Sequence, residues 1–343
     1  MQTKRSKNYM KGAIYMVATL LMAICGPDAA AQNAAAREHQ GARKLVTKAV
    51  LQERLEFLCD TLCEGRGCGQ HGGGVAAVWL AREFERMGLM KIGDSYGHAA
   101  TLKNGKYGRN IVGMLPGSKV TSRNRYIIVG AHYDHIGTLD GKTYPGADAN
   151  ASGTVALMSL VEMLSKHKDS GRTHDHNVIF VAFDGKEIDM AGSKALWRLI
   201  ENGQLIDPQS GERITKDKVS LMVNIDQIGC TMSPLASGRK DYIIMLGNHS
   251  LKPSAQDKIG FCNREYAIDM DIDLTYYGSK NFTKMFYRLS DQRVFIDNGI
   301  PAVLFTSGIT MNTNKTRDTA QTIDLDILKK RIFLMYHWLE NML

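Results

Sequence analysis

Six short runs of apolar and β-branched residues, separated by longer helical stretches, constrain the fold of this chain more than any other feature. The runs have strand length and cover residues 110–115, 126–131, 177–183, 219–225, 242–246 and 302–306. The predicted helices cover residues 152–167, 190–202, 282–287, 292–298 and 325–343. Strands that alternate with helices favour a parallel sheet covered on both faces. We therefore expect an α/β fold, a three-layer sandwich whose sheet is mixed but mostly parallel.

The segment before these strands is rich in glycine. Residues 51–58 have helical spacing, and residues 75–87 form a second predicted helix that ends at Gly88. Residues 64–74 between them hold too many glycines for a helix interior, so we predict a loop there. The polar stretches 204–218 and 247–277 are predicted to be surface insertions or lid-like loops.

The beginning of the chain has the pattern of an export signal. A basic run from Lys4 to Lys11 precedes a mostly apolar run over residues 12–25, and three alanines end at Ala31. We predict a signal peptide over residues 1–31, a single domain over residues 32–343, and an exported protein that is periplasmic or secreted. Two alternatives are an uncleaved apolar anchor and a lipoprotein acylated at Cys25, which is less favoured because Ile24 stands where a small residue is wanted.

The basic charge of the chain is concentrated in this leader. The formal net charge is +8, and the first 31 residues carry +3 of it, which leaves a mild +5 for the rest. The remainder has no block of Lys and Arg interleaved with aromatic residues, so we expect no nucleic-acid partner. After signal removal we expect no integral membrane span, because no further apolar run has the required length.

Polar side chains follow three of the predicted strands at the point where each strand ends. His132 and Asp134 follow the second strand, Lys186 and Glu187 follow the third, and Asp226 follows the fourth. Asp148 lies between them, in a tight loop over residues 146–153 that enters a helix. The carboxyl ends of parallel strands meet at one edge of a sheet, which is where open α/β sheets bind ligands. A set of His, Asp and Glu at such an edge is typical of a hydrolytic zinc site, and Asp134 is placed to orient His132.

These segments resemble a known family, metallopeptidase family twenty-eight. The resemblance is carried by residues 131–137, 146–153, 183–193, 224–226, 290–291, 299–301 and 318–319, in that order along the chain. It extends from about residue 55 to residue 323. The family comprises secreted dizinc aminopeptidases and their relatives, including glutamate carboxypeptidases and glutaminyl cyclases. It implies a zinc aminopeptidase-like fold and a peptide or amino-acid-like ligand.

The resemblance also implies a role for each matching position. His132 and Asp226 would hold one zinc, Asp148 would bridge both ions, and Glu187 would hold the second. A cis peptide would join Asp148 to position 149, where the family commonly has aspartate and this chain has Ala149. The last ligand of the second zinc is a histidine in the family, and here that position is Asn314.

The largest departure from the family pattern lies at the general base. The family has two adjacent glutamates, of which the first is the base, and this chain has Lys186 there. An ammonium group has three donors and no acceptor, so it does not take a proton from a metal-bound water. Two further family histidines are replaced, by Gln292 and Thr310. We expect one zinc site, with the second weakened by Asn314 and by the Lys186 charge.

The sequence therefore supports two functions of different classes. The first is an exported aminopeptidase-type metallopeptidase homologue that acts on or binds peptide N-termini, with hydrolysis weakened at Lys186 and Asn314. The alternative is a non-catalytic protein on the same fold that binds a peptide or another ligand. A third possibility, acyl transfer of the glutaminyl cyclase kind, has no special support in the sequence.

Overall fold

The computed structural model describes residues 41–102, 105, 107–118, 125–171, 174–235 and 237–343. The chain divides into two compact units, Met1–Lys44 and Leu45–Leu343. Of the first unit only residues 41–44 are described, and they are helical. The predicted signal peptide, with Cys25, lies outside the described residues. Among the residues that are described, no helix combines the length and the apolar character that a membrane crossing requires.

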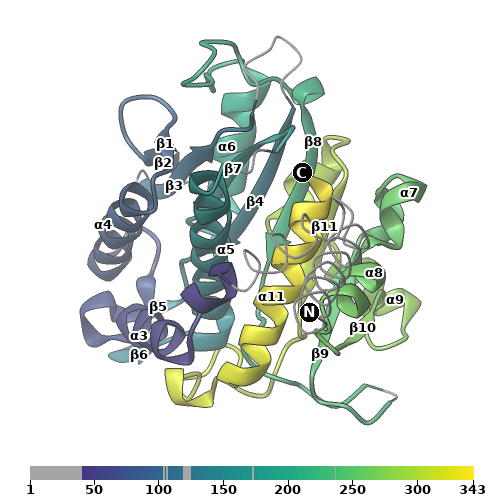
Figure 1. The fold of residues 1–343 in the computed structure, drawn as a ribbon. Helices are drawn as coiled ribbons and strands as arrows, with labels where there is room; N and C mark the ends of the chain where they lie inside the picture. The colour runs from purple at the N-terminus through teal and green to yellow at the C-terminus, as the bar shows by residue number, and fades with distance from the viewer. Residues whose placement is uncertain (1–40, 103–104, 106, 119–124, 172–173, 236) are drawn as a thin grey trace, which may run out of the picture. The chain divides into compact units, whose positions relative to one another are not determined.

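The second unit is built on a nine-stranded sheet (Figure 1). Its strands are β1 (Met90–Lys91), β2 (Gly97–Thr101), β3 (Tyr107–Leu115), β4 (Tyr126–His132), β7 (Asn177–Phe183), β8 (Val219–Ile225), β9 (Tyr242–Leu246), β10 (Asp271–Asp273) and β11 (Ala302–Thr306). They lie in the order β1-β3-β7-β4-β8-β11-β9-β10, and β2 pairs with β3. The central strands β7, β4, β8 and β11 are mutually parallel. All six predicted strands are present, and the carboxyl ends of these four meet at one edge.

The central strands form because their sequences suit burial on both faces. Every residue of β4 and β7 is buried, so an uninterrupted apolar run is stable there without polar alternation. Gly130 interrupts the run in β4 for a steric reason. A Cβ at Gly130 would lie 2.3 Å from the ring of Phe183 on the neighbouring strand. Glycine thus lets the Phe183 ring lie flat against the sheet.

Helices cover both faces of the sheet. One group comprises α4 (His71–Arg86), α5 (Ser152–Asp169) and α11 (Leu325–Met342), of which α5 packs on β4, β7 and β8. The other group, α6 (Ala191–Glu201) and α10 (Gln292–Asp297), packs on β2, β3, β8 and β11. In Figure 1, α5 and α11 lie in front of the sheet. This arrangement confirms the predicted α/β sandwich with a mixed, mostly parallel sheet.

The remaining elements are shorter. They are α3 (Lys48–Cys59), α7 (Pro253–Gln256), α8 (Lys258–Glu265), α9 (Lys280–Phe286), and a hairpin of β5 (Gly137–Leu139) and β6 (Lys142–Tyr144). Side-chain caps define several helix starts. The Thr47 hydroxyl accepts from the amide of Val50 at the start of α3, and the Asp324 carboxylate accepts from the amides of Asp326 and Ile327 at the start of α11.

The prediction of a glycine-rich loop over residues 64–74 is wrong in part, because only residues 67–70 lie outside a helix. A 3₁₀ helix, η1, covers Thr61–Arg66, and α4 begins at His71, so Gly72 and Gly73 lie in its first turn. The reason is close packing against the preceding chain. A Cβ at Gly72 would lie 2.1 Å from the Cys63 carbonyl oxygen, and one at Gly73 would lie 2.4 Å from the Gly67 carbonyl oxygen. Glycine at these two positions therefore allows the first turn of the helix to pack closely against the preceding chain.

The predicted loop over residues 247–277 is also wrong in part. It contains α7 and α8, and β10 extends the sheet by pairing in parallel with β9. The stretch 204–218 is mostly irregular, as predicted, but it is anchored. Leu205, Asp207 and Ile214 are buried, and Asp207 accepts hydrogen bonds from the side chains of Tyr126 and Asn177. Neither stretch is a free lid.

Candidate functional site

Five polar residues gather where β4, β7 and β8 end, and we call them the strand-tip cluster. His132 is the last residue of β4, and Asp134 follows two residues later. Lys186 and Glu187 lie in the turn after β7, and Asp226 directly follows β8. Because β7, β4 and β8 are adjacent and parallel, these segments reach the same sheet edge although up to 94 residues separate them in sequence. The expected meeting of these five residues is what the structure has.

His132 is completely buried and lies between two carboxylates. Its Nδ1 is 3.0 Å from the main-chain carbonyl of Asp134, and its Nε2 is 3.3 Å from Asp226 Oδ1. The Asp134 carboxylate is 3.5 Å from Nδ1. Burial alone would lower the pKa of His132, but Asp226 and Asp134 outweigh burial and raise that pKa to about 10. The two carboxylates thus favour the protonated form of the His132 imidazole, with Asp226 as its partner.

Asp134 also holds the turn that carries the next two cluster residues. Its Oδ1 accepts from the main-chain amide of Lys186, and its Oδ2 accepts from the amide of Glu187, each at 3.1 Å. One buried carboxylate therefore fixes both the β4 end and the β7 end of the cluster. The role of Asp134 is wider than the expected orientation of His132, because it also positions the backbone of Lys186 and Glu187.

Lys186 places a positive charge inside the cluster. Its Nζ lies 3.0 Å from Glu187 Oε1, and only 18% of its side chain is exposed. Burial lowers the pKa of Lys186, but the carboxylates of Asp226 and Glu187 outweigh burial and hold that pKa above its ordinary value. Lys186 and His132 in turn hold the pKa of Asp226 well below its usual range, although burial opposes them. Lys186 is thus an ammonium group bound among carboxylates.

The hydrogen-bond partners of the Asp148 carboxylate are not members of the cluster. Its Oδ1 accepts from the amides of Gly229 and Cys230 at 2.7 and 3.1 Å and from the Ser152 hydroxyl at 3.3 Å. Burial and the nearby Asp318 raise the pKa of Asp148 to about 6. Its Oδ2 is buried without a hydrogen-bond partner. Asp148 thus supports the loop that leads into α5.

Two further expectations differ from the structure. The cis peptide bond joins Ala149 to Asn150, one bond later than the expected bond after Asp148. Asn314 is exposed, in a left-handed conformation with φ 59°, and among the described residues its side chain makes no hydrogen bond to the cluster. The neighbouring Thr313 hydroxyl does reach toward the site, since it donates to Gln227 Oε1 at 2.8 Å.

A cavity of about 230 Å³ opens beside the cluster, and we call it the cluster cavity. Lys186 and Asp226 line one side of it. The rest of its wall is formed by Gln227, Tyr276, Phe286, Leu289, Ser290, Leu304, Thr306, Gly308 and Ile309. The rings of Tyr276 and Phe286 are stacked, with centroids 3.7 Å apart and planes 11° apart. A mainly apolar pocket thus has one cation and one anion at its edge.

Sequence reasoning did not find the walls of this cavity. Tyr276 had no spacing signal, and Phe286, Leu289 and Ile309 lie in other segments of the chain. No local pattern in the sequence marks them as cavity walls. In the structure Leu289 is 50% and Ile309 is 40% exposed, so these two apolar wall residues are partly accessible to solvent. Asp291, next to the wall residue Ser290, is fully buried, and burial raises its pKa to about 6.

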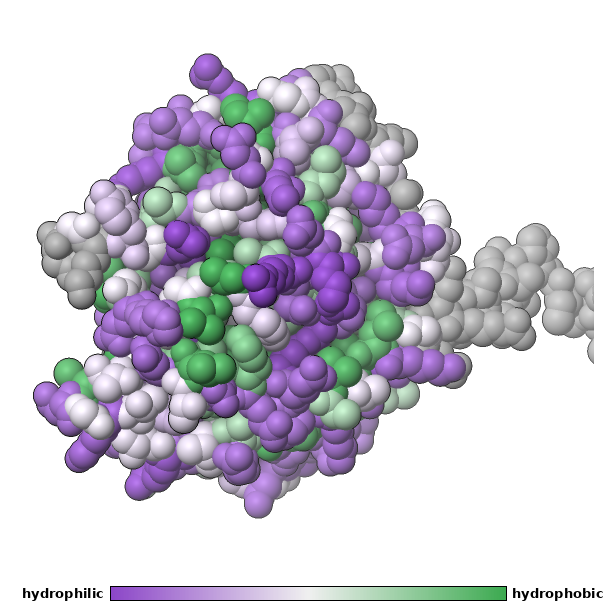
Figure 2. Space-filling view, turned by 90° about the vertical axis from the view of Figure 1, so that its left-hand side faces the viewer, coloured by the Kyte–Doolittle hydropathy of each residue, from purple (hydrophilic) through white to green (hydrophobic). Residues whose placement is uncertain are grey.

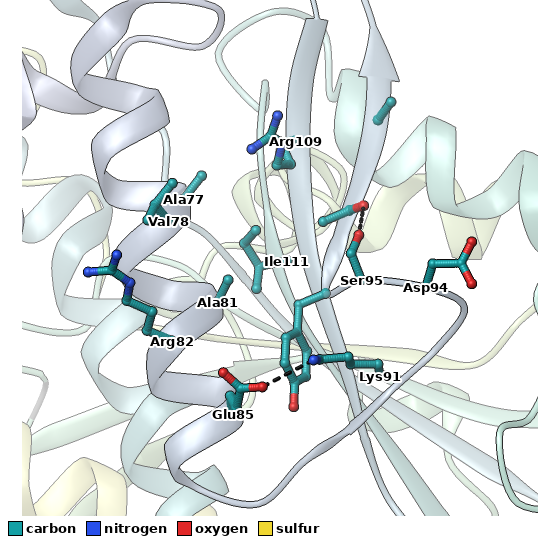
Figure 3. A pocket seen from close by; sticks show the side chains of 13 residues that line it. Ala77, Val78, Ala81, Arg82, Glu85, Lys91, Asp94, Ser95, Arg109 and Ile111 are labelled. Carbon is teal, nitrogen blue, oxygen red and sulfur yellow. Dashed lines mark hydrogen bonds and ion pairs between the residues drawn. The ribbon is translucent and has the colours of Figure 1, made fainter.

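A roomier cavity lies elsewhere, on the side of the molecule that carries α4. Figure 2 shows that side, where hydrophobic residues gather among hydrophilic ones. The cavity has a volume of about 580 Å³, and its lining includes the small residues Ala77 and Ala81 of α4 and Gly97 and Ala99 of β2. Figure 3 shows Ala77 and Ala81 on the side of the cavity that α4 forms. Its charged lining residues are exposed, and Glu85 pairs with Lys91 at 3.1 Å. No buried polar group of the lining points to a ligand, so we place the candidate site at the cluster.

Comparison with solved structures defines the class of fold. The aminopeptidase LapA of Legionella pneumophila has a TM-score of 0.65 at 18% identity, over 88% of this chain and 73% of that one. The glutaminyl cyclase of Macrostomum lignano has a TM-score of 0.64 at 16% identity, over 89% of this chain and 92% of that one. The fold is thus that of zinc aminopeptidases and glutaminyl cyclases.

Sequence comparison then assigns the family. The model of Peptidase family M28 matches residues 110–339, and this chain belongs to that family. It is also similar to leucine aminopeptidase 1 of Sclerotinia sclerotiorum, with 26% identity over 172 residues, which is 49% of this chain and 40% of the relative. The chain thus spans less than half of the length of that relative. The predicted family is confirmed.

The family implies zinc, and the side chains of the cluster can be tested against that ion. Two ligands of one tetrahedral zinc, each bonded at about 2.0–2.1 Å, lie about 3.3 Å apart, which matches the spacing of His132 Nε2 and Asp226 Oδ1. The match ends with this pair. Throughout the part of the chain that the structure describes, no three His, Cys, Asp or Glu side chains converge as metal ligands would. The neighbouring Lys186 ammonium repels a dication, so the residues present do not fit a dizinc centre.

Proposed function

We propose that this chain is an exported M28 homologue that binds a peptide or amino-acid-like ligand at the strand-tip cluster, and that its metal-dependent hydrolysis is weak or lost. One observation carries the proposal: the Lys186 ammonium lies 3.0 Å from Glu187, at the position where the family has its general base. The positive charge at this position is supplied by the Lys186 side chain instead of a metal ion. The cavity beside the cluster then serves as the binding site.

The chemistry of Lys186 explains why hydrolysis suffers. A metal-bound water needs an acceptor for its proton, and a general base contributes about 10²–10⁴ to the rate. Lysine can accept a proton only when its pKa falls toward neutrality. Asp226 and Glu187 move the pKa of Lys186 in the opposite direction. The Lys186 ammonium is therefore a permanent hydrogen-bond donor at the position where hydrolysis needs a proton acceptor.

A second candidate function is hydrolysis with a single zinc. The spacing of 3.3 Å between His132 Nε2 and Asp226 Oδ1 favours it, because this pair at the strand-tip cluster has the geometry of two zinc ligands. In this case Glu187 would give up its ion pair with Lys186 and become a further zinc ligand beside His132 and Asp226. The two candidates differ in whether added zinc produces peptidase activity in the native chain.

An activity assay separates these functions. The native protein and the triple variant Ala149→Asp, Lys186→Glu, Asn314→His are tested on a panel of aminoacyl chromogenic substrates with added zinc. We expect the native chain to be at least about 100-fold slower than the variant, the lower end of the contribution of a general base. Arg82→Glu, which reverses an exposed charge on α4, controls for added negative charge. A native turnover of about 1–10³ per second, typical of enzymes, would exclude the proposal.

The proposal of export rests on the basic and apolar pattern of residues 1–31. Cell fractionation followed by N-terminal sequencing tests it. We expect a mature chain that begins at Gln32. A chain that keeps Met1 favours the uncleaved anchor, and one that begins with a lipid-modified Cys25 favours the lipoprotein.

A further inference from the structure

We propose that the cluster cavity binds a free α-amino acid with an apolar side chain, whose carboxylate pairs with Lys186 and whose ammonium pairs with Asp226. The inference rests on the proposed function, because it takes the strand-tip cluster as a binding site. It goes further by naming a ligand with both a positive and a negative group on one small molecule.

The size of the cavity favours a single amino acid. Its volume of about 230 Å³ lies below the range of about 300–1,000 Å³ that is usual for drug-sized ligands. Its inner wall is apolar and partly aromatic, with Tyr276 stacked on Phe286 and with Leu304 beside them. A branched or aromatic side chain of one residue suits this space and gains from leaving water.

The charges at the edge of the cavity favour a zwitterion. Lys186 and Asp226 both line the cavity, and their side chains are only 18% and 9% exposed. Electrostatic interactions are stronger in such poorly solvated surroundings than in water. The ammonium of a peptide N-terminus that approached Asp226 would meet the like charge of Lys186. A free amino acid brings a carboxylate as well, which turns this repulsion into an ion pair.

The existing contacts of both residues leave room for a ligand. Lys186 uses one of its three ammonium donors on Glu187 Oε1. Asp226 uses Oδ1 toward His132 and is also hydrogen-bonded to the Ser290 side chain, whereas an ionised carboxylate has about four acceptor positions on its two oxygens. The cluster can therefore hold the two ends of an amino acid without breaking its own pairs.

Isothermal titration calorimetry with matched ligands tests the proposal. The probes are L-leucine, L-leucinamide, which lacks the carboxylate, N-acetyl-L-leucine, which lacks the ammonium, and the dipeptide Leu-Gly. We expect L-leucine to bind and each of the other three probes to bind at least about tenfold more weakly. L-leucinamide and N-acetyl-L-leucine each lose one charge-assisted contact, and Leu-Gly is too long for the cavity.

Variants identify the group that recognises the carboxylate. In Lys186→Met we expect the affinity for L-leucine to fall to that for L-leucinamide, while the affinity for L-leucinamide does not fall. Lys284→Met removes an exposed lysine on α9 and serves as the matched control, with unchanged binding. Ile309→Trp narrows the cavity at its rim without touching the cluster charges, and we expect it to weaken L-leucine binding about tenfold or more. It keeps the test valid if Lys186→Met does not fold.

The outcomes separate this inference from the proposed function. Equal affinity for L-leucine and L-leucinamide, no binding of any probe, or unchanged L-leucine binding in Ile309→Trp overturns the amino-acid assignment. A dipeptide that binds more tightly than L-leucine and stays intact also overturns it, but leaves the proposed function standing. A dipeptide that the native chain cleaves rapidly overturns the proposed function itself.

Discussion

Arg66 shows at the scale of one residue how the loops behind the site are held. Its guanidinium is fully buried and donates to the carbonyls of Leu58, Tyr133, Pro145 and Gly146, with the bond to Tyr133 at 2.7 Å. Tyr133 lies between two cluster residues, and Gly146 begins the loop of Asp148. One side chain therefore ties three segments together through main-chain oxygens.

We predict that Arg66→Met destabilises the protein by about 3–5 kcal/mol, because several buried carbonyls lose a charged donor at once. The free energy of unfolding from urea titration measures the loss. Arg82→Met, at an exposed position on α4, is the control and is expected to change stability by no more than about 0.5 kcal/mol. Equal effects of the two substitutions would show that the contacts of Arg66 carry no net stability.

A second residue, Asp207, links stability to pH. Burial opposes its ionisation, but hydrogen bonds from the Tyr126 hydroxyl and the amides of Gln209 and Ser210 outweigh burial and hold the pKa of Asp207 below its ordinary value. A carboxyl whose pKa is lower in the folded state stabilises that state above its unfolded pKa of about 3.9. This stability is lost as the pH falls through the lower, folded pKa.

We therefore expect Asp207→Asn to be less stable than the native chain by about 1–3 kcal/mol at pH 7, where the amide offers a weaker acceptor. The difference in unfolding free energy should shrink as the pH falls from about 4 toward 2. Denaturant titrations of both proteins across that interval measure it. A difference that stays constant with pH would rule out the charge of Asp207 as its source.

At the scale of elements, we expect the same substitution at two glycines near the start of α4 to change stability in opposite directions. A Cβ at Gly72 would lie 2.1 Å from the Cys63 carbonyl oxygen, whereas a Cβ at Gly74 would meet nothing within 4 Å. Gly72→Ala should therefore destabilise by about 1–3 kcal/mol, as overpacking does. Gly74→Ala should stabilise by about 0.5–1 kcal/mol through helix propensity. Thermal unfolding of the two variants compares them directly.

The main strands of the sheet could be predicted because burial on both faces leaves a simple trace in the sequence. β4 and β7 are continuous apolar runs of strand length. The missed strands lack that trace. β2 reads Gly-His-Ala-Ala-Thr and is only partly buried, and β10 has two aspartates in three residues. Both owe their conformation to a neighbouring strand, which local sequence does not reveal.

The candidate site could be predicted only as far as strand order carries it. His132, Lys186 and Asp226 come together because they end parallel neighbours. Asp148 and Asn314 depend on the path of loops, and the structure places both in surroundings that the sequence pattern did not indicate. The cavity needs α9, β11 and five separate loop segments at once, so no local pattern contains it.

At the scale of the whole molecule, the donor set makes a prediction about zinc. A ligand at 100 times its dissociation constant adds about 2.7 kcal/mol to the stability of the folded state. Because Lys186 lies among the carboxylates, we expect the melting temperature of the native chain to change by less than about 1 °C with excess zinc or with a chelator. The triple variant Ala149→Asp, Lys186→Glu, Asn314→His should gain a clear zinc-dependent rise. Such a rise in the native chain would instead favour the single-zinc function.

The parallel order β7-β4-β8-β11 has a consequence for how the chain matures. The cluster residues are distant in sequence and become neighbours only after several long-range strand pairings have formed, which is a slow kind of folding. A partly folded chain therefore has no complete binding site. Ligand capture would report the final stage of folding, and a small molecule that occupies the cluster would selectively protect chains that have reached that stage from proteolysis.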